Sequence, residues 1–411
     1  MKLINQYKGL RKELYYLFIG RVITAMGSFV MPMLILILKR KLGFSPSEIT
    51  IILTVFALIS LPATIIGGRL TDFIGRKKII IIFDLITVSM FIIGGIIPTS
   101  FTTVILIMLG AFFAQIEAPA YDALIADFSL PKDREKAYSL GYLGWNLGFV
   151  LGPTLGGFLF EDHLGLSFII NGIATLATTI IIIFFIHEKN AISSADQQKE
   201  LSEYEKGEKK VSIINVLKKN KTIFYVLIVG SIAGAVYSAM TIMLPMAMEE
   251  VYLENGATYY GLASSFNGLV VIIFTPILTI LIRRWKELSK MGLGVILFSL
   301  GLAFFFLINN LPFVFIGMFV FTIGEIVNTL GSSPYMTKRI PASHRGRIFS
   351  TRTIIAGLIG SISQLAIGFL LEKYTYNNVF IIYIVLGLIC GVIYWLLIKK
   401  DKEEYPKLYN S

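Results

Sequence analysis

The sequence has little charge and almost no cysteine. Only 15% of its 411 residues are Asp, Glu, Lys or Arg, whereas soluble domains have about a quarter, and 55% are hydrophobic. The single cysteine, Cys390, excludes an intramolecular disulfide. Three scattered histidines and one cysteine give no spacing typical of a metal site. The chain also lacks a Gly-rich loop ending in Gly-Lys-Ser/Thr, so we expect no metal, no cofactor and no direct ATP drive.

Long apolar runs take the place of the missing charge. Each run can cross a hydrocarbon core about 30 Å thick, and backbone in lipid must be helical to satisfy its hydrogen bonds. We therefore predict an all-α integral membrane protein with twelve transmembrane helices in two pseudo-symmetric six-helix bundles around a central cavity. No cleavage site follows the first run, so we expect it to be retained. The predicted helices lie at about 14–38, 49–71, 79–97, 101–126, 137–160, 167–187, 220–248, 257–282, 291–309, 311–337, 348–371 and 378–398.

Positive charge gathers on one side of these predicted helices. If both termini are cytoplasmic, the inner segments hold roughly 32 of the 37 Lys and Arg residues and the outer loops hold about four. This predicts a protein of the cytoplasmic (inner) membrane with both termini in the cytoplasm. The formal charge of +11 then points to membrane lipids as partners and not to nucleic acid. Lys39, Arg40 and Lys41 run against this assignment.

A polar segment divides the chain into two halves. We predict an N-terminal six-helix bundle at 1–187, a cytoplasmic linker at 188–219, and a C-terminal six-helix bundle at 220–411 with a short cytoplasmic tail. Part of the linker, 211–217, is either a short amphipathic helix on the inner surface or a plain solvated segment.

The two halves also resemble each other in sequence. Residues 131–139 parallel 341–350, and 157–161 parallel 368–372, with a constant offset of 211 from Arg134 onward. Parallel six-helix repeats place a substrate site at the midplane, between halves that rock against each other.

A charged corner at 67–78 connects two of the predicted helices. Gly75 permits the turn, and three cations follow it. The corner is either a topology anchor at the anionic inner leaflet or a latch that holds one conformation shut. Its residues fit a family pattern at Gly68, Leu70, Asp72, Gly75, Arg76 and Lys77, and depart from it at Phe73, where a cation is usual.

With this corner, the sequence resembles a major facilitator superfamily transporter, in particular the twelve-helix drug/proton antiporters. Asp127, at the end of the fourth predicted helix, also fits the family and is a plausible partner for the latch. The helix-4 arginine usual in the family, expected near 108–112, is missing. A motif that the resemblance associates with export over import stands in the fifth predicted helix, at Gly148, Gly152, Pro153, Gly156 and Gly157.

Ionisable residues inside the predicted spans are costly and usually functional. Glu117 and Glu325 lie near mid-span and are candidates for proton coupling, and Asp122 ranks below Glu117 because it lies about 140° further around the helix. Arg21 either reaches back to the headgroups or faces the cavity. For Glu117 and Glu325 the alternative is an interhelical contact, and for Asp84 we favour a structural one.

The substrate site is expected from helices that the resemblance places around the cavity. Met suits promiscuous apolar binding, although plain helix packing remains the alternative for these residues. The candidate substrate-binding residues are Arg21, Tyr121, Asn146, Tyr237, Met240, Met243 and Asn328.

These observations predict a transporter and not an enzyme. We expect a monomeric, proton-coupled exporter of small lipophilic compounds. An exporter or flippase for a lipid-linked or sugar-like metabolite is the alternative within transport, and a membrane sensor that moves nothing is the alternative outside it.

Overall fold

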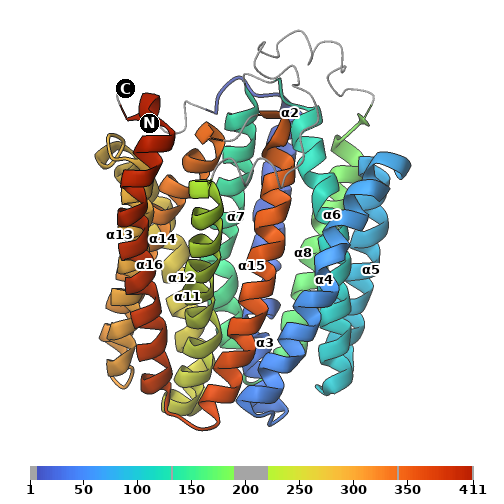
Figure 1. The fold of residues 1–411 in the computed structure, drawn as a ribbon. Helices are drawn as coiled ribbons and strands as arrows, with labels where there is room; N and C mark the ends of the chain where they lie inside the picture. The colour runs from blue at the N-terminus through green and yellow to red at the C-terminus, as the bar shows by residue number, and fades with distance from the viewer. Residues whose placement is uncertain (1–6, 131–132, 189–220, 340–341, 410–411) are drawn as a thin grey trace. The chain divides into compact units, whose positions relative to one another are not determined.

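The fold was derived from a computed structural model, which describes residues 7–130, 133–188, 221–339 and 342–409 (Figure 1). The predicted linker at 188–219 lies outside the described residues except for Glu188. All regular elements in the described ranges are helices, as predicted for an all-α chain. They are α2 (Lys12–Gly27), α3 (Val30–Leu36), the π-helix η1 (Ile37–Lys41), α4 (Pro46–Ile74), α5 (Arg76–Ile96), α6 (Phe101–Asp127), α7 (Arg134–Leu159), α8 (Leu164–Phe185), α11 (Lys221–Tyr252), η5 (Leu253–Asn255), α12 (Gly256–Leu281), α13 (Glu287–Phe304), η6 (Phe305–Leu307), α14 (Leu311–Arg339), α15 (Ala342–Leu371), α16 (Tyr376–Glu404) and η7 (Pro406–Leu408).

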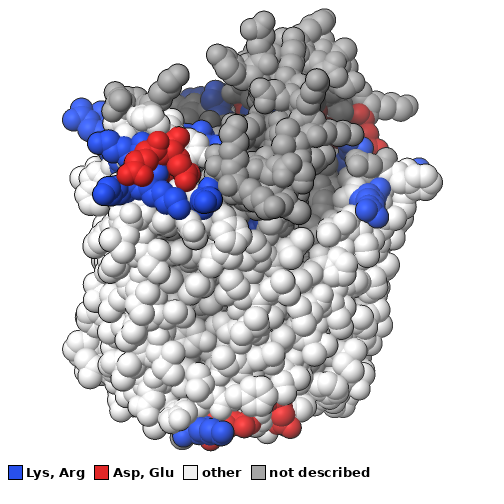
Figure 2. Space-filling model, viewed as in Figure 1, with Lys and Arg blue, Asp and Glu red and all other residues white. Residues whose placement is uncertain are grey.

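Ten segments of the described chain are long and apolar enough to cross a membrane. One of them, Lys221–Leu281, contains both α11 and α12, and α7 is not among the ten. The count of twelve spans therefore stays a prediction. Figure 2 shows Lys, Arg, Asp and Glu at the ends of the helices with a wide uncharged band between them, as helices in lipid require.

The chain forms two compact units. Unit 1 contains Met1–Phe44, Ile59–Leu201 and Glu254–Leu269, and unit 2 contains Ser45–Leu58, Ser202–Leu253 and Val270–Ser411. The helices α4 and α12 each contribute to both units.

The same packing pattern occurs in both units. In unit 1, α5 packs against α6 and α8, and α2 packs against α7 and α8. In unit 2, α13 packs against α14 and α16, and α11 packs against α15 and α16. Corresponding helices of the two halves therefore pack against corresponding neighbours.

The glycines of the helix-5 motif allow α7 to approach α2 closely. A Cβ at Gly148 would lie 2.4 Å from the carbonyl oxygen of Val22, and one at Gly156 would lie 2.8 Å from the Phe29 ring. Small residues at such a crossing let two backbones touch. Gly157 points elsewhere, since a Cβ there would lie 2.7 Å from the carbonyl oxygen of Ala257.

The cluster that runs against the charge asymmetry has an acidic partner. Arg40 Nε and Lys41 Nζ, in η1, each lie 3.2 Å from a carboxylate oxygen of Glu161. Lys41 also lies 5.0 Å from the centre of the Phe160 ring. The local excess of positive charge is thus smaller than the sequence alone indicates.

Candidate functional site

A cavity of about 370 Å³ lies within unit 1, between α2, α6 and α7. Polar and aromatic side chains dominate its wall, which suits a ligand that has both charge and apolar surface. The lining residues are Arg21, Asp122, Ile125, Tyr138, Gly141, Tyr142 and Trp145.

Arg21 faces this cavity and has an acidic partner. Its Nη2 atom lies 3.6 Å from Asp122 Oδ1, and the two side chains are 27% and 58% exposed. The guanidinium also lies 4.5 Å from the centre of the Tyr121 ring and 5.7 Å from that of Trp145. A single contact of 3.6 Å between partly exposed groups is weak, so Asp122 can exchange this partner for another cation.

Glu117 and Asp84 are two further acids of unit 1. Glu117 is within electrostatic range of Arg21, Asp84 and Asp122. The buried Asp84 accepts a hydrogen bond from Thr179 Oγ1, in α8, at 2.7 Å. Three acids and one arginine of unit 1 are therefore close enough to act on one another's charges, although Glu117 and Asp122 lie on different faces of α6.

Tyr121 and Asn146, two predicted substrate residues, also lie in unit 1. The Tyr121 side chain is buried, and its hydroxyl donates to the carbonyl oxygen of Leu17 in α2. The Asn146 amide donates to the carbonyl oxygen of Tyr142, one turn back on its own helix, at 2.8 Å.

Of the three aromatic residues of the wall, the sequence indicates only Trp145, as a weaker candidate for the substrate site. Tyr138 and Tyr142 stand with Trp145 at spacings of four and three residues, which is one face of a helix. The Tyr138 hydroxyl donates to the carbonyl oxygen of Asp122 at 3.1 Å. An aromatic stripe at helical spacing, on the helix that carries the glycine motif, is the signal that could have identified them.

The predicted latch residues lie at or near a corner where the end of α4, the start of α5 and the ends of α6 and α8 meet. Gly75 has φ +102°, a backbone conformation that favours glycine. Arg76 Nε, at the start of α5, lies 3.1 Å from Asp127 Oδ2, at the end of α6. Lys77 Nζ donates to the carbonyl oxygens of Ile183 and Ile186, at the end of α8, at 2.7 Å each. The Lys77 backbone N–H donates to Glu188 Oε1 at 3.0 Å.

Two predicted latch residues lie on α4. The side chain of Asp72 is outside the described part of the structure. A Cβ at Gly68 would meet nothing within 4 Å, whereas one at Gly67 would lie 2.0 Å from the carbonyl oxygen of Ile116. Packing therefore requires glycine at position 67, and any requirement at Gly68 stays a prediction.

The remaining predicted residues belong to unit 2. The Tyr237 ring packs on Phe298 and Phe321, with centroids 5.8 and 5.3 Å away. Met240 and Met243 are buried. Asn328 and Glu325 lie on α14, where the Asn328 amide donates to the carbonyl oxygen of Met291 at 3.4 Å. Whether these residues share a cavity with Arg21 stays a prediction, as does the proton-coupling role of Glu325.

Comparison with known proteins identifies a family. The model of the Major Facilitator Superfamily matches residues 17–363 and 256–410. The uncharacterized MFS-type transporter YqjV of Bacillus subtilis is 23% identical over 312 residues, which are 75% of this chain and 73% of that protein. A Na(+), Li(+), K(+)/H(+) antiporter of Planococcus maritimus is 22% identical over 358 residues, 81% and 84% of the two chains. The quinolone resistance protein NorA of Staphylococcus aureus is 31% identical over 195 residues, 46% and 49% of the two chains.

Solved structures share the fold. A POT family transporter in complex with 5-aminolevulinic acid has a TM-score of 0.77 at 15% identity and covers 96% of this chain and 97% of its own. The nucleoside transporter NupG has a TM-score of 0.74 at 13% identity and covers 93% of this chain and 99% of its own.

Proposed function

Because this chain belongs to the Major Facilitator Superfamily, and is therefore a membrane transporter and not an enzyme, we propose that it exports small lipophilic compounds in exchange for protons. The transport cycle is alternating access between a state open to the cytoplasm and a state open to the outside. Both termini, the charged corner at 67–78 and the linker face the cytoplasm in this proposal. The polar segment at 188–219 gives the boundary between the two bundles.

One observation carries the proposal: Asp122 opens into an aromatic cavity with only a weak contact to Arg21. Aromatic faces attract organic cations, and a carboxylate gives such a cation its counter-ion. The same carboxyl can instead take up a proton. A cationic substrate and a proton therefore compete for one charge, which is the requirement for exchanging one against the other.

Glu117 is the second titrating group of the proposal. It lies within electrostatic range of the same arginine. When Asp122 loses Arg21 to a bound cation, Arg21 is released to Glu117, and the proton held there can leave. The names of two relatives, a cation/H+ antiporter and a quinolone resistance protein, support proton coupling and drug export.

The energy of one proton is sufficient for this work. A driving force of about 150 mV is worth about 3.5 kcal/mol per charge. Since about 1.4 kcal/mol corresponds to tenfold, one proton sustains a substrate gradient of roughly a few hundredfold.

The test is transport in proteoliposomes with an imposed pH gradient and a panel of cationic and neutral dyes. Asp122→Asn removes the counter-ion, and a charge-assisted contact is worth about 1.5–3 kcal/mol. We expect cationic dyes to bind roughly 10- to 100-fold more weakly and neutral dyes to bind as before. Glu117→Gln should abolish pH-driven efflux and keep dye exchange without a gradient.

Glu403→Gln is the matched control, because Glu403 is an exposed acid at the end of α16. It should behave as wild type. Cationic dye efflux that is unchanged in both Asp122→Asn and Glu117→Gln contradicts the proposal.

A second candidate function is exchange of a small inorganic cation for protons. It is favoured by the relative from Planococcus maritimus, which matches 81% of this chain. The Asp84 carboxylate and the Thr179 hydroxyl are oxygen donors of the type that hard cations prefer. Proton movement driven by Na+, Li+ or K+ in the same proteoliposomes, with no response to any dye, would favour this candidate.

A further inference from the structure

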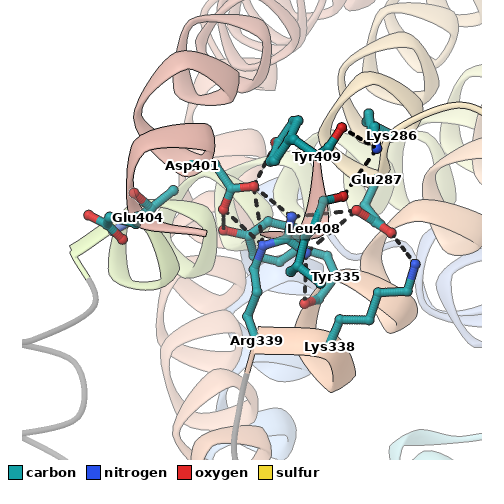
Figure 3. A network of polar contacts seen from close by, with 10 residues as sticks. Lys286, Glu287, Tyr335, Lys338, Arg339, Asp401, Glu404, Leu408 and Tyr409 are labelled. Atoms are coloured by element: carbon teal, nitrogen blue, oxygen red, sulfur yellow. Dashed lines mark hydrogen bonds and ion pairs between the residues drawn. The ribbon is translucent and has the colours of Figure 1, made fainter. Parts of the chain in front are cut away.

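Arg76 and Asp127 form the ion pair of the charged corner at 67–78, which we call the first corner. Unit 2 has an ion pair at the corresponding helix ends, with the charges exchanged. Adding 211 to the residue number takes Arg76 to Glu287 and Asp127 to Lys338. Lys338 Nζ lies 2.6 Å from Glu287 Oε1. As in unit 1, one partner begins a helix (α13) and the other lies near the end of the helix packed beside it (α14). We call the cluster of Lys286, Glu287, Lys338, Arg339 and Asp401 the second corner (Figure 3).

The second corner contains a buried pair that has no counterpart among the described side chains of the first corner. Arg339 Nε donates to Asp401 Oδ1 at 2.9 Å and Nη2 donates to Oδ2 at 2.6 Å. The Arg339 side chain is 1% exposed and that of Asp401 is 0% exposed. Arg339 also lies 3.5 Å from Glu287 Oε2, and its guanidinium is 4.0 Å from the centre of the Tyr335 ring. Two parallel hydrogen bonds to one carboxylate fix the geometry of the pair.

The C-terminal segment covers this pair. The Tyr409 hydroxyl donates to Asp401 Oδ2 at 2.6 Å. Burial raises the pKa of Tyr409, so its hydroxyl stays a donor at neutral pH. Lys286 Nζ donates to the carbonyl oxygen of Leu408 at 3.1 Å and lies 5.2 Å from the centre of the Tyr409 ring. Figure 3 shows these groups converging from α13, α14, α16 and the segment after α16.

The two corners differ in how firmly their charges are held. The Arg76 and Asp127 side chains are 33% and 29% exposed, and among the described residues a single contact joins them, so water can replace either partner at little cost. In the second corner, separating Arg339 from Asp401 would leave two buried charges without partners, which is strongly unfavourable.

The charges of the two corners are placed differently with respect to the helix dipoles. The N-terminus of a helix is partially positive and the C-terminus partially negative. In the first corner, a cation stands at the start of α5 and an anion at the end of α6, so both charges oppose their helix dipoles. In the second corner, Glu287 starts α13 while Lys338 and Arg339 end α14, so these charges agree with the dipoles. The resistance of the second corner to separation therefore rests on the burial of Arg339 and Asp401 and not on the helix dipoles.

We propose that Arg339 is a positioning residue for transport: it keeps the second corner closed throughout the cycle, as a fixed anchor for α13, α14 and α16, while the ion pair of the first corner opens and closes. The anchor rests on the proposed alternating-access cycle. In this arrangement the first corner changes during the transport cycle and the second corner stays fixed.

The test compares two neutralised corners in the full-length protein. Arg339→Gln/Asp401→Asn removes both buried charges and keeps amide groups that can hydrogen-bond to each other. Arg76→Gln/Asp127→Asn does the same in the first corner. Arg339→Gln alone leaves the Asp401 charge buried without its main partner, so it should lower both the Tm and the dye efflux. An anchor needs only that the three helices stay attached to one another, so Arg339→Gln/Asp401→Asn should restore the wild-type Tm and at least half of the wild-type dye efflux. The Arg76→Gln/Asp127→Asn variant should keep its Tm and lose efflux more than tenfold. A second-corner variant with normal Tm and more than tenfold loss of efflux overturns the proposal.

Amide hydrogen exchange of the wild-type protein in lipid nanodiscs gives a measurement that does not depend on any variant folding. Between pH 6 and pH 8, after correction for the intrinsic rate, protection at 72–78 and 124–128 should change more than tenfold. Protection at 335–339 and 397–404 should stay within twofold. Equal changes at both corners, or no change at the first, overturn the proposal. A wild-type protein that moves no dye in a pH gradient would contradict the proposed function alone. The comparison of amide hydrogen exchange at the two corners would still test whether the second corner is a fixed anchor.

Discussion

At the scale of the residue, the two acids of α6 stand in different surroundings. Asp122 opens into a cavity, whereas Glu117 lies among Arg21, Asp84 and Asp122. The helical spacing correctly separates the two acids onto different faces, but it says nothing of the arginine. Arg21 comes from α2 and is within electrostatic range of both, so the two acids need not share a face to be coupled.

Trp145→Ala should weaken the binding of cationic dyes. The Trp145 ring lies 5.7 Å from the Arg21 guanidinium and lines the cavity, so a bound cation that displaces Arg21 would meet the same ring. A cation–π contact is worth about 0.5–2 kcal/mol, which corresponds to roughly 2- to 30-fold in affinity. Fluorescence titration of the purified protein measures this change.

Trp145→Phe is the control, because it keeps an aromatic face and should recover most of the affinity. Equal losses in the alanine and phenylalanine variants would show that the face of the ring does not contribute.

At the scale of the element, neighbouring glycines on α4 have different roles. A Cβ at position 67 would lie 2.0 Å from a backbone oxygen of α6, which cannot move without shifting that helix. At position 68 a Cβ would meet open space. The family pattern identifies Gly68, and only the structure identifies Gly67 as the point of close approach.

Gly67→Ala should therefore destabilise the protein, and Gly68→Ala should not. Overpacking of this kind costs about 1–3 kcal/mol, whereas alanine in place of an exposed helical glycine is neutral or favourable. The measurement is the Tm in detergent, and the two variants control each other for helix propensity. A Gly67→Ala protein as stable as Gly68→Ala would mean that α4 and α6 are further apart than this packing requires.

The helices and their packing neighbours follow largely from the sequence. Apolar runs and charged interruptions predict the helices, because lipid leaves no other backbone structure. The repeat offset of 211 predicts matching neighbours for corresponding helices. Motif comparison could not identify the second corner, because Glu287 and Lys338 carry charges opposite to those of Arg76 and Asp127. The attraction between the two positions is kept, and the residue types are not. The wall of the cavity was out of reach because it depends on which faces of α2, α6 and α7 meet.

At the scale of the whole molecule, the asymmetry of charge predicts the orientation in the membrane. The apparent exception at Arg40 and Lys41 is partly neutralised by Glu161, so it weighs less than its three cations suggest. Both termini are therefore expected in the cytoplasm.

Cysteine labelling in intact cells tests this orientation. The background is Cys390→Ala, which removes a buried thiol. An impermeant maleimide should label Asp162→Cys, in the exposed connection between α7 and α8, in intact cells. It should label Phe73→Cys, at a position whose side chain is 90% exposed, only after the cells are opened. Labelling in the reverse order would place the termini outside.

The reversed polarity of the two corners also limits how the halves can be recombined. In a chimera that replaces α5 by α13, Glu287 would face Asp127, and in one that replaces α6 by α14, Lys338 would face Arg76. Either graft alone sets like charges against each other. Only the exchange of both helices together preserves the attraction between the two charges. The smallest unit that can be exchanged between the halves is therefore a pair of helices and not a single helix.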